Sequence, residues 1–246
     1  MVLSDIRKQA REALTNKWGK GALITLVYFL FTFVLGFISG LVEDIAVLSF
    51  TVEIATIVIS IPISFGLIAS FIKLKRGEEV KVFEFFSFGF TNFARAWKIA
   101  GNILLKMWLP ILLYVISIFV LIFATSFGIA TYAISNSGSF VVIASIIGFA
   151  LFIAAFVYLF VKSLLYNLTY LVAYDNEAME AKDAVEESAK LMTGNRGKYV
   201  LLQLSFIGWA ILTVFTLYIG MLWLIPYMQV AIVCFYEGLK DKNVEE

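Results

Sequence analysis

Charged side chains close to long apolar segments are the first candidates for chemistry in this chain. Lys162 ends an apolar run at 140–162, and a cation at bilayer depth costs about 3 kcal/mol unless it is paired or reaches the surface. Counted from the polar turn near Gly138, Lys162 falls roughly 36 Å along a helix, at the inner interface. We therefore expect a snorkelling lysine, with a paired functional charge as the alternative. Asn167 would follow it and contact the inner loops.

Polar residues near or within other apolar runs have both a functional and a structural interpretation. Glu53 lies near the outer end of the second run, close to Glu43 and Asp44, and is either a solvated boundary residue or an ion-binding carboxylate. Gln203 and Gln229 occupy the fifth and sixth runs. Because a buried amide in lipid needs a partner, we predict that they form interhelical hydrogen bonds.

The residue types that are missing exclude several function classes. The chain has no histidine and one cysteine, so structural zinc, iron–sulfur clusters and disulfides within the chain are not expected. It contains no phosphate-binding loop, nucleophile triad or paired intramembrane carboxylates. We expect no catalytic residue, no metal and no cofactor, and therefore a protein that is not an enzyme.

The composition is that of a membrane protein. Apolar residues make up 61% of the 246 residues, charged residues 15%, and the mean hydropathy is +0.93. The apolar runs continue for about 20 residues or more, which selects spanning helices over the alternating pattern of an outer-membrane barrel. The sequence thus predicts an all-α, polytopic membrane helix bundle that forms one domain over 1–246.

Six runs are long enough to span a bilayer. They lie near 21–41, 47–72, 107–133, 140–162, 199–218 and 220–236. The sixth run is short, so it is either a full span or a re-entrant segment.

The distribution of basic residues predicts the orientation. Every Lys and Arg except Lys162 lies in the N-terminal segment, in the segments 73–106 and 175–198 with their immediate flanks, or in the C-terminal tail. The connections on the other side, around 42–46, 135–139 and 219–221, contain none. By the positive-inside rule we expect both termini in the cytoplasm.

The inner segments resemble one another. Apolar residues in 3–18 and 177–192 recur at spacings of three and four beside charged residues, which predicts amphipathic helices at the membrane surface. Both segments, and the middle one near 91–98, end in a polar turn with a cation and an aromatic ring. This pattern indicates either a unit used three times or the ordinary composition of helix entries into a membrane.

The C-terminal part carries a more specific pattern. Gly208-Trp209, a run from Ile219 to Tyr227 that includes Trp223 and Pro226, and the closing Phe235-Tyr236-Glu237 resemble the signature of the family named domain of unknown function 975. The basic opening from Ile6 to Trp18 is similar too. The resemblance implies a bacterial integral membrane protein and no known activity or catalytic residues.

The leading hypothesis is a non-enzymatic multi-pass protein of the bacterial cytoplasmic membrane that binds membrane lipids or partner membrane proteins, including copies of itself. It rests on the interfacial helices, the 16% aromatic content and the lack of catalytic groups. A small transporter or channel, motivated by the possible repeat, the three prolines and the acidic residues around Glu53, is the alternative. We expect no nucleic-acid partner.

Overall fold

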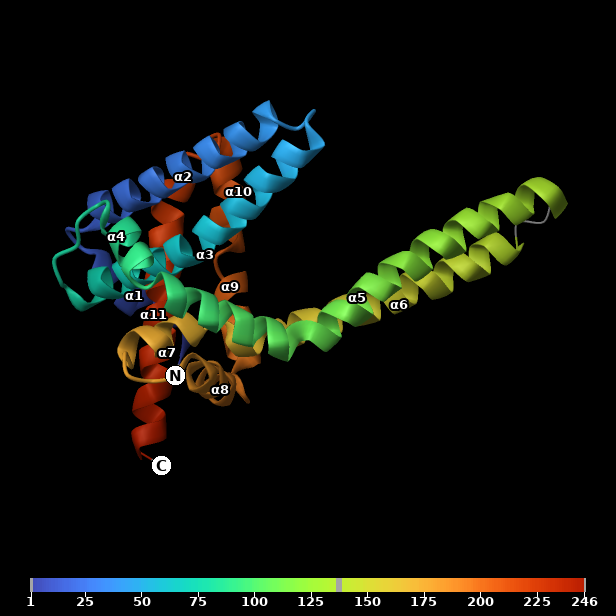
Figure 1. The fold of residues 1–246 in the computed structure, drawn as a ribbon. Coiled ribbons are helices and arrows are strands. Elements are labelled where there is room, and N and C mark those ends of the chain that lie inside the picture. The colour runs from blue at the N-terminus through green and yellow to red at the C-terminus, as the bar shows by residue number, and fades with distance from the viewer. Residues whose placement is uncertain (1, 136–138, 246) are drawn as a thin grey trace. The chain divides into compact units, whose positions relative to one another are not determined.

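The computed structural model describes residues 2–135 and 139–245, and every regular element in these two ranges is a helix (Figure 1). In chain order the helices are α1 (Leu3–Leu14), α2 (Trp18–Leu41), α3 (Ala46–Arg76), α4 (Glu84–Thr91), α5 (Phe93–Ser135), α6 (Ser139–Ser163), a 3-10 turn (Leu164–Tyr166), α7 (Thr169–Asp175), α8 (Ala181–Met192), α9 (Arg196–Leu204), α10 (Ile207–Phe215) and α11 (Met221–Glu245). The predicted all-α fold is confirmed.

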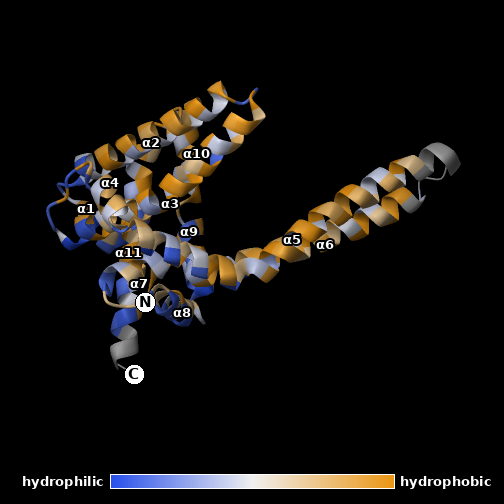
Figure 2. Ribbon diagram, in the orientation of Figure 1, coloured by the Kyte–Doolittle hydropathy of each residue, from blue (hydrophilic) through white to orange (hydrophobic). Residues whose placement is uncertain are grey.

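Six helical stretches of the described chain are long and apolar enough to cross a membrane. They are α2, α3, most of α5, α6 with α7, α9 with α10, and α11. Figure 2 shows hydrophobic residues along α2, α3, α5 and α6, and hydrophilic residues at α1, α8 and the end of α11. The predicted polytopic membrane helix bundle is therefore confirmed.

The helix boundaries refine the predicted spans. The run at 199–218 is not one helix, because α9 ends at Leu204 and α10 begins at Ile207. The third predicted span is the later part of a helix that begins at Phe93. The predicted connection at 135–139 lies mostly outside the described residues.

The chain divides into two compact units, Met1–Ala100 with Leu168–Glu246, and Gly101–Asn167. The second unit contains most of α5 and all of α6, which run side by side (Figure 1). A Cβ on Gly148 would lie 3.3 Å from the Cα of Leu121, so this glycine permits close contact between the two helices. Each unit is compact by itself, and a single membrane domain over 1–246 stays a prediction.

In the first unit, α4 crosses α3 at very short range. A Cβ on Gly66 would overlap the carbonyl oxygen of Phe85, and a Cβ on Gly89 would lie 2.6 Å from the carbonyl oxygen of Pro62. Two glycines on facing surfaces therefore allow backbone to pack on backbone. This contact holds the aromatic helix α4 against the middle of α3.

Pro62 also explains a contact between α3 and the start of α5. Proline has no N–H, so the carbonyl oxygen of Val58 one turn earlier loses its helical partner. The indole N–H of Trp97 donates to that oxygen at 3.1 Å. Trp97 thus satisfies a polar group that would otherwise stay unpaired in an apolar environment.

Two of the three predicted repeat junctions share one backbone conformation. Thr15 and Thr193 have extended ψ angles of 129° and 126°, and each hydroxyl donates to the carbonyl oxygen four residues earlier, at 3.2 and 2.7 Å. The next residues, Asn16 and Gly194, have φ angles of 64° and 80°. At the junction between α4 and α5, Asn92 follows the helix with a φ of −100° and no such turn forms.

The helices before these two junctions bury equivalent positions. Each has three nearly inaccessible residues spaced four apart, at the same distance before the junction. They are Ile6, Ala10 and Leu14 in α1, and Ala184, Ser188 and Met192 in α8. In α1 these residues belong to the apolar spacing seen in the sequence, whereas in α8 the middle position is the polar Ser188. The location of both helices at the membrane surface stays a prediction.

Candidate functional site

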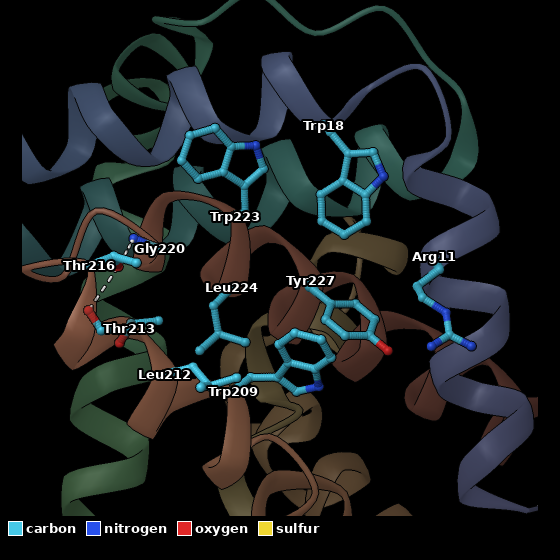
Figure 3. Close-up of a pocket in the computed structure, with 10 residues that line it drawn as sticks. All are labelled: Arg11, Trp18, Trp209, Leu212, Thr213, Thr216, Gly220, Trp223, Leu224 and Tyr227. Atoms are coloured by element: carbon cyan, nitrogen blue, oxygen red, sulfur yellow. Dashed lines mark hydrogen bonds between the residues drawn. The ribbon is translucent and has the colours of Figure 1, made fainter.

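A cavity of about 370 Å³ lies between α1, the start of α2 and the α10–α11 hairpin (Figure 3). Three of the chain's five tryptophans, Trp18, Trp209 and Trp223, line it together with Tyr227 and Arg11. We call this site the tryptophan groove. The side chains of Trp209 and Trp223 are 57% and 46% exposed, so two of its walls are open to the surroundings.

The turn between α10 and α11 shapes one side of the groove. The Thr216 hydroxyl donates to the carbonyl oxygen of Thr213 at 2.9 Å and accepts from the backbone N–H of Gly220 at 3.0 Å. A Cβ on Gly220 would lie 3.0 Å from the Cγ2 of Thr213, so the turn has little room for a side chain. It brings Leu212 and Leu224 to the same cavity (Figure 3).

The start of α2 approaches α11 closely on the other side. A Cβ on Gly21 would lie 2.9 Å from the Cβ of Pro226, so these two helices meet at a glycine and a proline. The ring of Tyr227 packs edge-on against Trp18 at 6.0 Å and Phe206 at 4.9 Å between centroids. Tyr227 is thereby packed between the start of α2 and the residue that precedes α10.

The polar groups gather at one end of the groove. The hydroxyl of Tyr227 donates to the carbonyl oxygen of Arg7 over a long 3.4 Å, and the guanidinium of Arg11 lies within electrostatic reach of it. In Figure 3 the ring nitrogen of Trp209 lies on the same side. Arg11 forms no ion pair with a carboxylate of the described residues.

The residues that build this groove include Trp209, Trp223 and Tyr227 from the C-terminal pattern noted in the sequence. The profile of the family described as protein of unknown function (DUF975) matches residues 1–243. The chain belongs to the DUF975 family. Comparisons with curated proteins and with solved structures gave no match. The predicted resemblance is confirmed over almost the whole chain.

The motif residues of this DUF975 chain divide between two sites. Trp223 and Tyr227 line the groove, and Pro226 packs on α2. Tyr236 lies farther along α11, where its hydroxyl donates to a carboxylate oxygen of Asp175 at 3.1 Å. The motif therefore serves both a cavity and a polar cluster.

Asp175 is the centre of this polar cluster. Its side chain is only 7% exposed and pairs with Arg76 and Lys240, each at 2.7 Å. Glu237 pairs with Lys75 and with Arg76. The cluster joins the ends of α3 and α7 to α11, and because each acid has two basic partners its burial is electrostatically compensated.

A separate ion pair joins α4 to α3. The ammonium of Lys73 lies 2.5 Å from a carboxylate oxygen of Glu84, and the backbone N–H of Lys81 donates to the other oxygen at 3.0 Å. Burial raises the pKa of Glu84, but the two hydrogen bonds and the positive charges of Lys73 and Lys81 together lower it by more, so the pKa lies below its ordinary value. Glu84 is held ionised against α3.

The predicted polar candidates do not converge in one place. Glu53 is exposed on α3, Lys162 is half-buried in the last turn of α6, and Asn167 is exposed after the 3-10 turn. Gln203 approaches the hydroxyl of Tyr199 within its own helix. Gln229, on α11, is half-buried.

None of these five residues lines the groove. Within the described residues, no hydrogen bond joins the amides of Gln203 and Gln229 to another helix, so the predicted interhelical bond is not formed there. The position of Lys162 at the inner membrane interface, which the count along the sequence predicts, stays a prediction.

Sequence reasoning missed Arg11 and Trp18 as partners of the C-terminal motif. Both are visible in the N-terminal segment, where Arg11 is one of several cations and Trp18 belongs to the turn before the first span. The missing information is the packing of α1 and α2 on α11, because it joins residues about 200 positions apart. No local pattern in the sequence indicates that contact.

Proposed function

We propose that this DUF975 protein is a non-enzymatic, multi-pass protein of the bacterial cytoplasmic membrane, with both termini in the cytoplasm, that binds a phospholipid in the tryptophan groove. The orientation is supported by the positions of the basic residues and the positive-inside rule. The observation that carries the lipid proposal is the groove itself, an aromatic cavity with a cation at one end.

The chemistry of the groove matches an amphiphile. Indole rings give large, rigid contact surfaces and prefer the region where acyl chains meet headgroups. Trp209 and Trp223 are exposed on helices that are apolar enough for a membrane, so their natural neighbours are lipid molecules. Arg11 adds a charged donor where an acyl chain would continue into a headgroup.

The alternatives have less support from the described residues. A transporter or channel needs polar groups along a path, and neither Glu53 nor Lys162 borders the groove. A partner protein or a second copy would need a complementary surface of its own. The groove is a concave site of about 370 Å³, a size that suits part of one small molecule.

Native mass spectrometry of the protein in mild detergent tests the proposal. The wild type should retain bound phospholipid through delipidation, and a variant with both Trp209→Ala and Trp223→Ala should lose it. Trp108→Ala is the matched control, because Trp108 is 59% exposed and lies outside the groove. A wild type that carries no lipid, or equal loss in the control, would overturn the proposal.

A further inference from the structure

We infer that the lipid is an anionic phospholipid of the cytoplasmic leaflet, because the α10–α11 hairpin enters the membrane from the cytoplasmic side without crossing it. This inference rests on the proposed function and adds the leaflet and the headgroup charge. Three independent observations carry it: the depth of the hairpin, the chemistry of its tip and the position of Arg11.

The contact between Gly21 and Pro226 limits how deeply the α10–α11 hairpin can reach into the membrane. At 1.5 Å per residue, α2 extends about 30 Å from Gly21 to its C-terminal end, whereas α11 extends only about 8 Å from Pro226 back to its first residue. The hydrocarbon core is about 30 Å thick. If α2 crosses it, the hairpin tip ends roughly 20 Å below the far surface, even with the two helices parallel.

The tip of the hairpin is too apolar for water. Phe215 and Leu217 are 82% and 84% exposed, and the sequence from 207 to 225 contains no charged residue. By contrast, the connection between α2 and α3 carries Glu43 and Asp44, both exposed. The charged connection suits an aqueous surface, and the apolar tip suits the hydrocarbon core.

The backbone of the tip is suited to a medium without water. Every N–H from 216 to 224 donates within the hairpin, including Tyr218 to the carbonyl oxygen of Thr213 at 2.8 Å. Leu217 and Tyr218 have φ angles of 50° and 65°, a conformation that non-glycine residues adopt at some cost. A turn inside lipid must satisfy its own polar groups, and this turn satisfies its backbone N–H groups from 216 to 224.

Arg11 determines the headgroup. Lipid tails are as apolar as the bilayer around them, so burying a tail in the groove gives little hydrophobic gain. Selectivity must come from the polar end, where the guanidinium of Arg11 lies near the hydroxyl of Tyr227. A guanidinium binds phosphate with paired, charge-assisted hydrogen bonds, and the start of α2 beside it is at the cytoplasmic headgroup level.

The headgroup is tested by competition in native mass spectrometry, with phosphatidylglycerol and phosphatidylcholine of identical acyl chains. The wild type should prefer phosphatidylglycerol by about tenfold or more, the scale of one charge-assisted hydrogen bond. Arg11→Gln should remove the preference and Arg11→Lys should keep part of it. Lys8→Gln, on the same helix and outside the groove, is the control.

The outcomes separate the two proposals. If the wild type binds both lipids equally and the double tryptophan variant still loses them, the headgroup inference fails and the proposed function stands. If the wild type binds neither lipid, the proposed function fails. A preference that Lys8→Gln removes as fully as Arg11→Gln would also overturn the role of Arg11.

Cysteine labelling tests the leaflet. Cys234, the single cysteine, is replaced by Ala, and Leu217→Cys or Glu43→Cys is added. A membrane-impermeant maleimide applied to intact cells should label the cysteine at position 43 and leave the cysteine at position 217 unmodified. External labelling at position 217 would show that the hairpin reaches the far surface and would overturn the assignment of the leaflet.

Discussion

Gly66→Ala should be one of the most destabilising single-methyl additions in this chain, because the crossing of α3 and α4 leaves no space for a side chain. The new Cβ would overlap the carbonyl oxygen of Phe85, lie 2.8 Å from its carbon and 3.1 Å from the amide nitrogen of Gly89. Ordinary contacts to a Cβ are 3.4–4 Å, so backbone atoms would have to move. Overpacking of this kind costs about 1–3 kcal/mol, and rigid backbone neighbours place Gly66→Ala at or above the upper end.

The chain contains its own reporter for this experiment. Cys234 is the single cysteine and is buried, so a thiol-reactive fluorogenic dye detects unfolding as this residue becomes accessible. A loss of about 3 kcal/mol should lower the Tm by roughly 6–12 °C in a chain of this size.

Gly36→Ala is the matched control. A Cβ there meets nothing within 4 Å, and alanine is a better helix former by about 1 kcal/mol. Its Tm should stay the same or rise slightly. Two results would contradict the close crossing of α3 and α4: a Tm of Gly66→Ala within about 2 °C of the wild type, or an equal decrease of the Tm in both variants.

Three further predictions concern polar contacts of the first unit. Asp175→Asn should destabilise the protein by about 1–3 kcal/mol, because it removes the charge from the buried acceptor that Arg76, Lys240 and Tyr236 share; the exposed Asp183→Asn should have almost no effect on the same thermal assay. Because the pKa of Glu84 is depressed, its contribution to stability is fully present above its ordinary value of 4.5 and is lost as the pH falls below it; Glu84→Gln should flatten this part of the Tm-against-pH curve. Trp97→Phe should cost about 1–3 kcal/mol by leaving the carbonyl oxygen of Val58 unpaired, and an unchanged Tm would contradict that hydrogen bond.

Much of the fold could be predicted because its main signals are local. Runs of apolar residues correspond to the long helices, and spacings of three and four residues in the N-terminal segment correspond to the buried face of α1. The break between Leu204 and Ile207 was not predicted, although Ser205 lies in it and Gly208 follows it, residue types that occur at helix kinks. Such residues do not mark a break by themselves, because Gly66 and Ser70 lie within the continuous helix α3.

The candidate site was only half visible in the sequence. Trp223 and Tyr227 stood out because they belong to a compact motif, whereas Arg11 looked like any other cation near a membrane surface. Its place at the groove follows from the packing of α1 on α11. Glu53 and Lys162 drew attention by charge alone, and charge says nothing about which side chains meet in space.

Photo-crosslinking gives the most direct test of lipid binding in the tryptophan groove. The protein is reconstituted with a trace of phosphatidylglycerol that carries a diazirine in the acyl chain, irradiated, digested and mapped by mass spectrometry. Lipid binding in the groove predicts crosslinks concentrated in peptides that contain Trp209 or Trp223, above those from α6, where residues such as Ile146 are 62% exposed and would meet bulk lipid. Crosslinks spread evenly over all exposed apolar helices would contradict a specific lipid site.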